Sequence, residues 1–199
     1  YQDRCLDISS TFINKPIHLV GHSFGATVAL RVAQRFPNFV KSISLIEPVF
    51  FAAAFSDYRE LEAQFMLDHA DYFSAGEDKN WQLAAELFLK LWGNNEDWNL
   101  LSESKKRQFA QRIPLTFEVS KAIYSDPHDM LKEHAFSSLT GKASIIYGDM
   151  SHFIMPYICK ALSVRIPNTE LKCIQNAGHM LPITHPKICA QIINKTIEP

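Results

Sequence analysis

Residues 16–30 constrain the fold of this chain more than any other stretch, because they join a strand, a sharp turn and a helix. The apolar run at residues 17–20 predicts a buried strand, and the pattern of residues 26–36 predicts a helix. The turn between them, residues 21–25, has the pattern Gly-x-Ser-x-Gly with Ser23 at its apex. A serine on such a turn projects its hydroxyl beyond the end of the sheet, where it is placed to act as a nucleophile.

Two glycines, Gly21 and Gly25, flank the apex of this turn. We expect both to be needed, because a Cβ atom at either position would crowd the strand against the helix. The helix that follows directs free backbone N–H groups and a partial positive charge at the apex. The turn therefore predicts a nucleophile beside an anion-binding site. The glycine spacing differs from the Gly-x-Gly-x-x-Gly of dinucleotide sites, which disfavours a Rossmann fold.

Length and charge narrow the class of protein. The chain has 199 residues, a formal net charge of -1 and 47% hydrophobic residues, which predicts a globular protein with one substantial core. The balanced charge gives no reason to expect a nucleic-acid partner, and the basic run at residues 105–107 is expected on a solvated helix face. No apolar run is long enough to span a bilayer and the start shows no signal-peptide pattern, so no membrane association is predicted.

The four cysteines, Cys5, Cys159, Cys173 and Cys189, show no Cys-x-x-Cys spacing. This predicts neither a zinc site nor a redox motif. The last three lie in apolar helical or strand patterns, so we expect buried free thiols and a cytoplasmic protein.

The chain begins at Tyr1 without a methionine, and the turn at Ser23 follows after very few residues. A sheet of this type needs several strands before such a turn. We therefore expect the chain to be the C-terminal part of a longer protein, with an N-terminal segment that is not present here.

The chain divides into two α/β parts separated by a helical insertion. The first part is residues 1–50, the insertion is residues 51–138, and the second part is residues 139–199. The predicted strands cover residues 17–20, 40–46, 143–147 and 170–174, and the predicted helices cover residues 3–13, 26–36, 57–73, 78–92, 102–113, 114–124, 156–164 and 186–197. Short joints between strand and helix imply parallel strands with right-handed crossovers.

The insertion is expected to form a lid over the edge of the sheet. It holds all three tryptophans, Trp81, Trp92 and Trp98. They either line a substrate pocket or pack in the small core of the lid itself, and both alternatives stay open at this point.

His179 is the candidate base for Ser23. A serine hydroxyl is a weak nucleophile unless a base takes its proton and a carboxylate orients the base. His179 follows the last predicted strand directly after Gly178, and the order Ser, acid, His is the one that this type of turn uses. The other seven histidines are predicted to be structural or surface residues, namely His18, His22, His69, His128, His134, His152 and His185.

Residues 19–25, 45–48 and 178–186 resemble the α/β-hydrolase superfamily, in its form with a helical cap. The resemblance covers essentially the whole chain but only the later part of the family's domain. It implies an α/β fold with a mostly parallel sheet, helices on both faces and an inserted all-helical cap, the N-terminal strands being absent from this chain. It also implies Ser23 as nucleophile, His179 as base and the backbone N–H of Phe24 as one oxyanion donor, with the second donor outside this sequence.

Two carboxylates, Glu47 and Asp149, are candidates for the acid that orients His179. Glu47 ends the second predicted strand, at the same sheet edge as Ser23, and some relatives place the acid there. The family usually places an Asp three residues after the glycine that ends the third strand, but here that position is Ser151, while Asp149 follows Gly148 directly. A strand-end Glu that binds loop backbone and a turn-forming Asp are the structural alternatives.

From these observations we predict a serine-dependent hydrolase that acts on an ester or related carbonyl substrate through an acyl-enzyme. The resemblance implies no cofactor and no metal. Hydrolysis of a C–C bond in a diketone-type substrate is a variant of this hypothesis. The alternative of another class is a non-catalytic protein of the same fold that binds a small apolar ligand under the cap. A homodimer is a further expectation.

Overall fold

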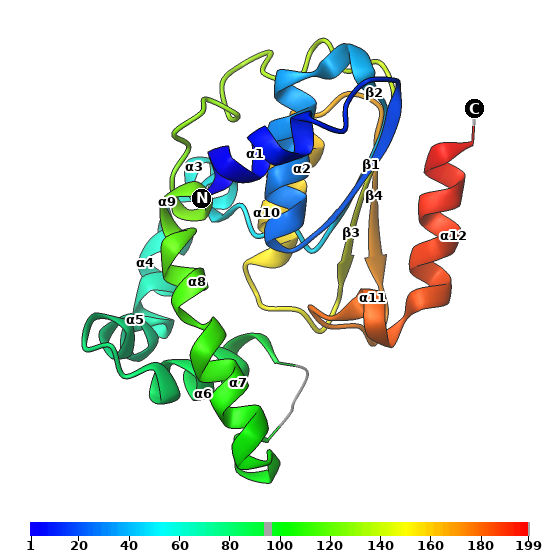
Figure 1. Cartoon of the computed structure of the whole chain (residues 1–199). Helices are drawn as coiled ribbons and strands as arrows, with labels where there is room; N and C mark the ends of the chain where they lie inside the picture. Colours follow the sequence, from blue (N-terminus) through cyan, green and yellow to red (C-terminus); the bar gives the residue numbers. More distant parts are fainter. Residues whose placement is uncertain (94–96, 199) are drawn as a thin grey trace.

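The computed structural model describes residues 1–93 and 97–198. Within these residues the strands form one parallel sheet in the order β1-β2-β3-β4 (Figure 1). The strands are β1 (Ile17–His22), β2 (Val40–Ile46), β3 (Lys142–Gly148) and β4 (Thr169–Ile174). The four predicted strands are therefore confirmed, with differences of one or two residues at their ends.

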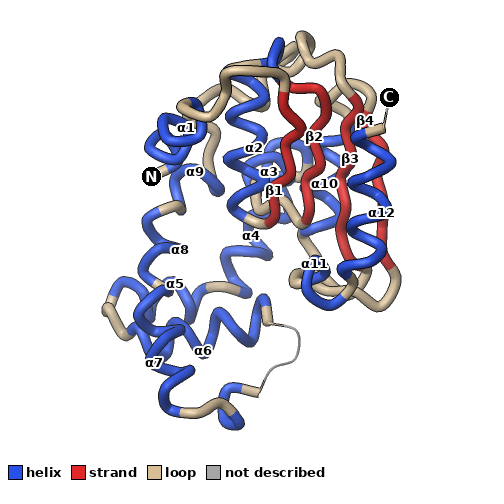
Figure 2. Tube along the Cα trace, turned by 45° about the vertical axis from the view of Figure 1, so that its right-hand side comes forward, coloured by secondary structure: helices blue, strands red, loops and turns tan. Residues whose placement is uncertain are grey.

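Helices connect and cover the strands. They are α1 (Gln2–Ser10), α2 (Phe24–Arg35), α3 (Phe51–Asp57), α4 (Arg59–Asp68), α5 (Ala70–Glu77), α6 (Trp81–Trp92), α7 (Glu103–Arg112), α8 (Pro114–Glu118), α9 (Ser120–Tyr124), α10 (Met155–Ser163), α11 (Leu181–Thr184) and α12 (Pro186–Ile197), with short 3-10 turns η1 (Pro37–Phe39) and η2 (Trp98–Leu100). Helices α2 and α10 pack on one face of the sheet, and α12 packs on the other (Figures 1 and 2). This arrangement confirms the predicted α/β fold with helices on both faces.

The main core lies between the sheet and helices α2, α3 and α10. Strand β2 supplies Ile43 and Leu45, and β3 supplies Ile145, all of them buried. A second buried cluster on the opposite face joins Ile46 and Ile146 to α12. Because β2 and β3 are covered on both faces, residues 42–46 and 143–146 are all buried, and the buried hydroxyl of Ser144 donates to that of Ser44 at 2.9 Å.

Strand β1 is less buried than its apolar sequence predicts. His18 is exposed, and Val20 retains 51% of its accessible surface. The reason is geometric, because β1 is at the end of the strand order and α12 packs on β2 and β3 rather than over β1. The prediction of a strand here is confirmed, and the prediction that it is buried is wrong.

The cap projects from the sheet edge at which the strands end (Figure 1). Its helices α5 to α8 surround a cluster of their own, which includes Tyr72, Leu89 and Trp98. Trp81 packs against this cluster, whereas Trp92 belongs to the main core cluster. The alternative of packing inside the cap therefore holds for Trp81 and Trp98, whereas Trp92 packs in the main core next to the sheet.

The helix predicted over residues 57–73 is interrupted. Helix α3 ends at Asp57, and the chain turns again at His69, between α4 and α5. The His69 Nδ1 atom lies 2.8 Å from the Phe65 carbonyl oxygen, to which the His69 backbone N–H also donates. The backbone of His69 leaves the helical region, with φ of -102° and ψ of 4°, and this separates α4 from α5. Helix α3 lies within the predicted insertion but packs in the main core. The predicted start of the insertion at residue 51 therefore stays a prediction.

Candidate active site

Ser23 lies between the end of β1 and the first residue of α2. Its φ of 56° and ψ of -126° are unusual for a residue with a side chain, and strain of this kind is concentrated at functional sites. The Ser23 N–H donates to the Ile46 carbonyl oxygen at 3.0 Å, which ties the turn to β2. Phe24 N–H is the first amide of α2 and has no acceptor within the helix.

The two glycines of the turn have different roles. A Cβ atom on Gly21 would lie 2.5 Å from the Gly25 carbonyl oxygen and 2.7 Å from the Ala26 nitrogen, so a side chain there would force the turn open. At Gly25 the same construction meets nothing within 4 Å. The prediction of crowding is confirmed for Gly21 and wrong for Gly25, because the Gly25 Cβ direction points away from the strand into open space.

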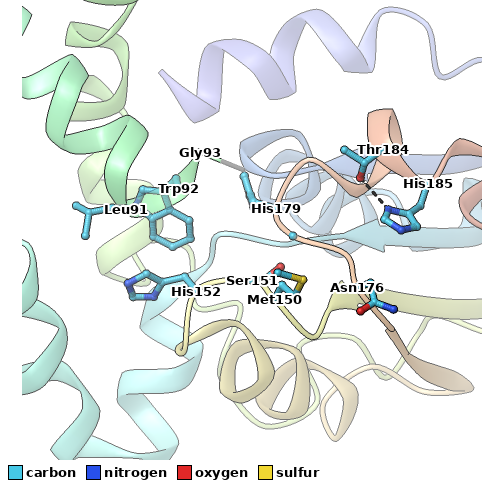
Figure 3. Close-up of a pocket in the computed structure, with 11 residues that line it drawn as sticks. Leu91, Trp92, Gly93, Met150, Ser151, His152, Asn176, His179, Thr184 and His185 are labelled. Atoms are coloured by element: carbon cyan, nitrogen blue, oxygen red, sulfur yellow. Dashed lines mark hydrogen bonds between the residues drawn. The ribbon is translucent and has the colours of Figure 1, made fainter. Parts of the chain in front are cut away.

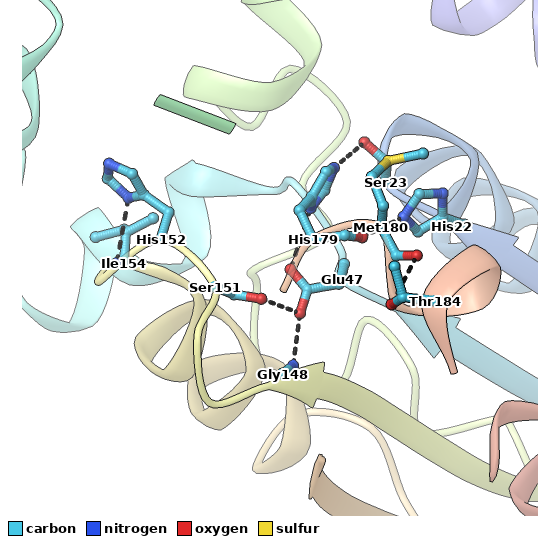
Figure 4. Close-up of polar contacts among 10 residues, drawn as sticks. All are labelled: His22, Ser23, Glu47, Gly148, Ser151, His152, Ile154, His179, Met180 and Thr184. Carbon is cyan, nitrogen blue, oxygen red and sulfur yellow. Dashed lines mark hydrogen bonds and ion pairs between the residues drawn. The ribbon is translucent and has the colours of Figure 1, made fainter. Parts of the chain in front are cut away.

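His179 links Ser23 to a carboxylate. The His179 Nε2 atom lies 3.0 Å from Ser23 Oγ, and Nδ1 lies 3.1 Å from Glu47 Oε2 (Figure 4). A carboxylate accepts hydrogen bonds, so Nδ1 carries the proton and Nε2 presents its lone pair to the serine hydroxyl. The structure thus brings together three of the predicted residues, which we call the Ser23–His179–Glu47 cluster.

Glu47 is held at the end of β2 by the neighbouring strand. Its side chain is fully buried, and its backbone φ of 49° turns the chain sharply. The Oε1 atom accepts hydrogen bonds from Gly148 N–H and from Ser151 Oγ–H, both at 2.7 Å (Figure 4). These donors stabilise the charged carboxylate and leave Oε2 free to bind His179.

Asp149 is not part of this cluster. It lies exposed at the end of β3, and its backbone N–H donates to the Ile174 carbonyl oxygen at 3.0 Å. Ser151 occupies the position at which the family usually has its Asp, and here it donates a hydrogen bond to the carboxylate that comes from β2. Of the two predicted acids, the structure places Glu47 beside His179 and leaves Asp149 at the surface.

Replacing Ser151 with alanine removes one of the two hydrogen bonds that anchor Glu47 Oε1. A hydrogen bond to a charged group contributes about 1.5–3 kcal/mol, so, for the ester hydrolase predicted from the sequence, we expect kcat to fall roughly 10-fold with little change in KM. Ser151→Thr, which keeps the hydroxyl, is expected to restore most of kcat. Steady-state kinetics of the two variants measures this. Equal kcat in Ser151→Ala and the unmodified protein would contradict a positioning role.

His22, which the sequence predicted to be a structural or surface residue, contacts the backbone of His179. Its Nε2–H donates to the backbone carbonyl oxygen of His179 at 2.8 Å, and the two imidazole rings lie 5.1 Å apart. Burial lowers the pKa of His22, and the hydrogen bond to the carbonyl offsets part of this effect. In the sequence, only its position directly before Ser23 indicated that it could contact the site. The contact couples the nucleophile turn to the loop that carries His179.

A cavity of about 260 Å³ opens beside His179, between the end of α6 and the loops that follow β3 and β4 (Figure 3). Trp92 forms part of its wall and stacks on His152, with ring centroids 4.6 Å apart. His69 packs edge-on behind His152 at 5.1 Å. The lining residues are Leu91, Trp92, Gly93, Met150, Ser151, His152, Asn176, Gly178, His179, Thr184 and His185.

His152 makes the stability of the protein sensitive to acid. Burial, followed by the nearby His69, lowers the pKa of His152 to about 4, against 6.5 for an ordinary histidine. Between these values the unfolded chain binds more protons than the folded chain, so the free energy of unfolding falls as pH decreases from 6.5 towards 4. We expect His152 to account for about 1–2 kcal/mol of this loss, after allowance for its partial exposure.

The test is urea unfolding at pH 7 and pH 5 for the unmodified protein and for His152→Phe, which keeps an aromatic ring against Trp92. The variant is expected to lose less stability between the two pH values. The same loss in both proteins would show that His152 does not carry this dependence.

The remaining expectations concern metals, thiols and membranes. Within residues 1–93 and 97–198 no three His, Cys, Asp or Glu side chains gather as a metal site would need. The cysteines are free, and Cys159 and Cys189 are buried as predicted. The prediction of a buried thiol is wrong for Cys173, which is exposed because β4, last in the strand order, is only partly covered along most of its length. In the same ranges, none of the helices combines the length and apolar character needed to cross a bilayer.

A parallel sheet that presents Ser23, His179 and a buried carboxylate at its carboxyl edge, under a helical cap, defines a protein of the α/β-hydrolase fold. The family model described as alpha/beta hydrolase fold matches residues 7–186, and the chain belongs to this family.

The individual relatives share only 17–25% sequence identity with the chain. The chain is 25% identical over 209 aligned positions to ethanol acetyltransferase 1 of Cyberlindnera fabianii. The alignment covers 94% of the chain and 62% of that protein, so the chain spans less than two thirds of this curated relative. A solved carboxylesterase of the thaumarchaeon Nitrososphaera gargenis matches with a TM-score of 0.62 and 19% identity over 98% of this chain and 70% of that one. The α/β hydrolase MGS-M2, from a Medee basin deep-sea metagenome, matches with a TM-score of 0.68 and 17% identity over 96% and 70%.

Proposed function

We propose that this chain carries the catalytic centre of a serine hydrolase that cleaves an ester or related carbonyl compound through an acyl-enzyme. The observation that carries the proposal is the continuous chain of contacts from Ser23 Oγ through His179 to the buried carboxylate of Glu47. A hydroxyl, a base and an orienting carboxylate in this order are the parts that nucleophilic acyl transfer requires. Membership in the α/β hydrolase family adds support.

The proposed reaction uses the contacts of the Ser23–His179–Glu47 cluster. Ser23 Oγ attacks the carbonyl carbon while His179 Nε2 takes its proton, and Glu47 stabilises the imidazolium that forms. The bond to the alcohol oxygen breaks, and His179 gives the proton to that oxygen. Water then attacks the acyl carbon, His179 takes a proton from the water, and the proton returns to Ser23 as the acid leaves.

Phe24 N–H supplies one oxyanion donor in this proposal. It follows the nucleophile directly and is a first-turn amide of α2, where the helix has its positive end. A preorganised donor of this kind acts on the charge that develops in the transition state rather than on the substrate.

Alcohols are a second acceptor class to test in place of water. The only observation that favours acyl transfer to an alcohol is the likeness to a protein named ethanol acetyltransferase. Both reactions share the acyl-enzyme on Ser23, so the proposal does not depend on the choice. C–C bond hydrolysis also fits the same cluster, and a homodimer and a reducing, cytoplasmic environment stay predictions.

Labelling with a fluorescent alkyl phosphonate tests whether Ser23 is an activated nucleophile. We expect one label per chain, on the peptide that contains Ser23, and no label after Ser23→Ala. Far-UV circular dichroism shows that both proteins are folded. A folded protein that takes up no label would favour the alternative, a non-catalytic protein that binds a small apolar ligand under the cap.

A further inference from the structure

Two adjacent residues of the nucleophile turn contact the same histidine. Ser23 Oγ lies 3.0 Å from His179 Nε2 (Figure 4). His22 Nε2–H donates to the backbone carbonyl oxygen of His179 at 2.8 Å. One contact is made with the reacting nitrogen of the base and the other with its main chain, so the turn that carries the nucleophile holds the base at two points.

The helix that follows His179 does not satisfy this carbonyl oxygen. In a helical turn the oxygen would accept from the third or fourth residue along the chain. The third is Pro182, which has no N–H, and the N–H of the fourth, Ile183, donates to the Met180 carbonyl oxygen at 2.9 Å. Within the described residues, His22 is therefore the donor to the His179 carbonyl oxygen.

The loop that carries His179 is anchored on its other side by the end of β3. The Ala177 carbonyl oxygen accepts from Met150 N–H at 2.9 Å, and it lies so close to Gly148 that a Cβ atom on this glycine would not fit. These contacts fix the loop two residues before the base. The hydrogen bond from His22 fixes the loop at the base itself.

His22 donates this hydrogen bond as a neutral imidazole. Burial lowers its pKa, and the opposing effects of the bonded carbonyl and of the Glu47 carboxylate do not reverse the shift, so the ring is uncharged at pH 7. A carbonyl only accepts, so Nε2 carries the proton. The rings of His22 and His179 lie 5.1 Å apart. A neutral His22 therefore places no second positive charge beside the imidazolium that the proposed reaction forms on His179.

We infer that His22 is a positioning residue for the base, and that its Nε2–H holds the His179 backbone where the imidazole stays within reach of Ser23 Oγ. The inference rests on the proposed function, because the role it assigns is in the proton transfer from Ser23. Misplacing a reacting group by about 1 Å can cost about 100-fold in rate, so a contact that fixes the base acts on kcat.

Two amide variants of His22 differ in reach and test this role. The side-chain NH₂ of glutamine comes near the place of Nε2, whereas that of asparagine comes near the place of Nδ1 and falls short of the carbonyl oxygen. We expect His22→Asn to lower kcat for p-nitrophenyl acetate about 10-fold with KM nearly unchanged, and His22→Gln to stay within about 3-fold of the unmodified protein. His22→Ala is expected to show the same loss as His22→Asn.

Phosphonate labelling separates slow proton transfer from a loss of folded protein. In His22→Asn we expect Ser23 to reach one label per chain, at a rate about 10-fold lower than in the unmodified protein. A smaller final amount of label that forms at an unchanged rate would show a purely structural role and overturn the inference.

His18→Asn and His18→Gln are the matched controls. His18 lies near the other end of β1, and its Nδ1 is 2.8 Å from Ser42 Oγ. Both variants are expected to keep kcat. Unchanged kcat in His22→Asn, or equal losses in His22→Asn and His22→Gln, would overturn the positioning role and leave the proposed function intact. Absence of Ser23 labelling in the folded, unmodified protein would overturn the proposed function, and the positioning role with it.

Discussion

Ser23→Ala is expected to lower kcat/KM for a small activated ester by at least about 10⁴-fold, because the nucleophile of every turnover is removed. Only the activity that comes from binding and from the oxyanion donor would remain. The fold should be retained, since the strained turn is held by backbone contacts, such as the hydrogen bond from Ser23 N–H to Ile46, that alanine keeps.

Purified variant and unmodified protein are to be compared on the same ester, with urea unfolding as the check of folding. Ser10→Ala is a suitable control, since Ser10 is a surface residue of α1 whose hydroxyl only binds the Asp7 carbonyl oxygen. It is expected to retain full activity. Turnover that survives in Ser23→Ala at more than a few per cent would remove Ser23 from the mechanism.

Glu47→Gln is expected to reduce kcat about 10³–10⁴-fold, the second largest effect, by analogy with loss of the orienting carboxylate in serine proteases. The size of the amide is similar, so the pocket stays filled. Gly148 N–H and Ser151 Oγ–H require an acceptor at the inner position, which turns the amide NH₂ towards His179. That NH₂ donates to Nδ1 and favours the tautomer with the proton on Nε2, which cannot accept a proton from Ser23.

Asp149→Asn is the matched control for this variant. Asp149 lies exposed on the neighbouring strand end, and we expect its kcat to change less than about 2-fold, as for surface substitutions away from the site. A large loss in Asp149→Asn with a small one in Glu47→Gln would mean that the acid had been assigned to the wrong strand. Mild, equal losses in both variants would refute a carboxylate in either place.

The fold could be predicted well because its signals are local. Strands β2 and β3 are rich in β-branched and other apolar residues and lie next to Gly or Pro, and the Gly-x-Ser-x-Gly turn marks the joint between β1 and α2. The break at His69 could not be predicted in the same way, because residues 65–73 contain no Gly or Pro that would mark it. The exposure of Val20 depends on which strands α12 covers, and this is a property of the packed sheet.

The site could be predicted in part. Ser23 and His179 have recognisable positions along the chain, so sequence alone selected them. The choice between Glu47 and Asp149 needed the distances between three loops that are far apart in sequence. Ser151 carried a signal, since it stands where the family usually has an acid, but its hydrogen bond to Glu47 appears only when β2 and β3 lie side by side.

The environment of the cavity was beyond sequence reasoning. His152 was expected to be a structural or surface residue, and its packing against Trp92 at the wall of the cavity could not be anticipated. Nothing in the local sequence shows that the last residue of α6 and the loop after β3 meet, because a whole cap lies between them in the chain. Contacts of this kind follow from the way the cap closes on the sheet.

The most direct test of the account is to trap the acyl-enzyme. The protein is mixed with a fast-reacting ester such as p-nitrophenyl acetate and quenched in acid within milliseconds, and intact-mass and peptide mass spectrometry locate the acyl group. The account predicts a mass gain of one acetyl group on the peptide that contains Ser23, with faster accumulation than decay. Ester turnover without acetyl on Ser23, or with acetyl on another residue, would contradict it.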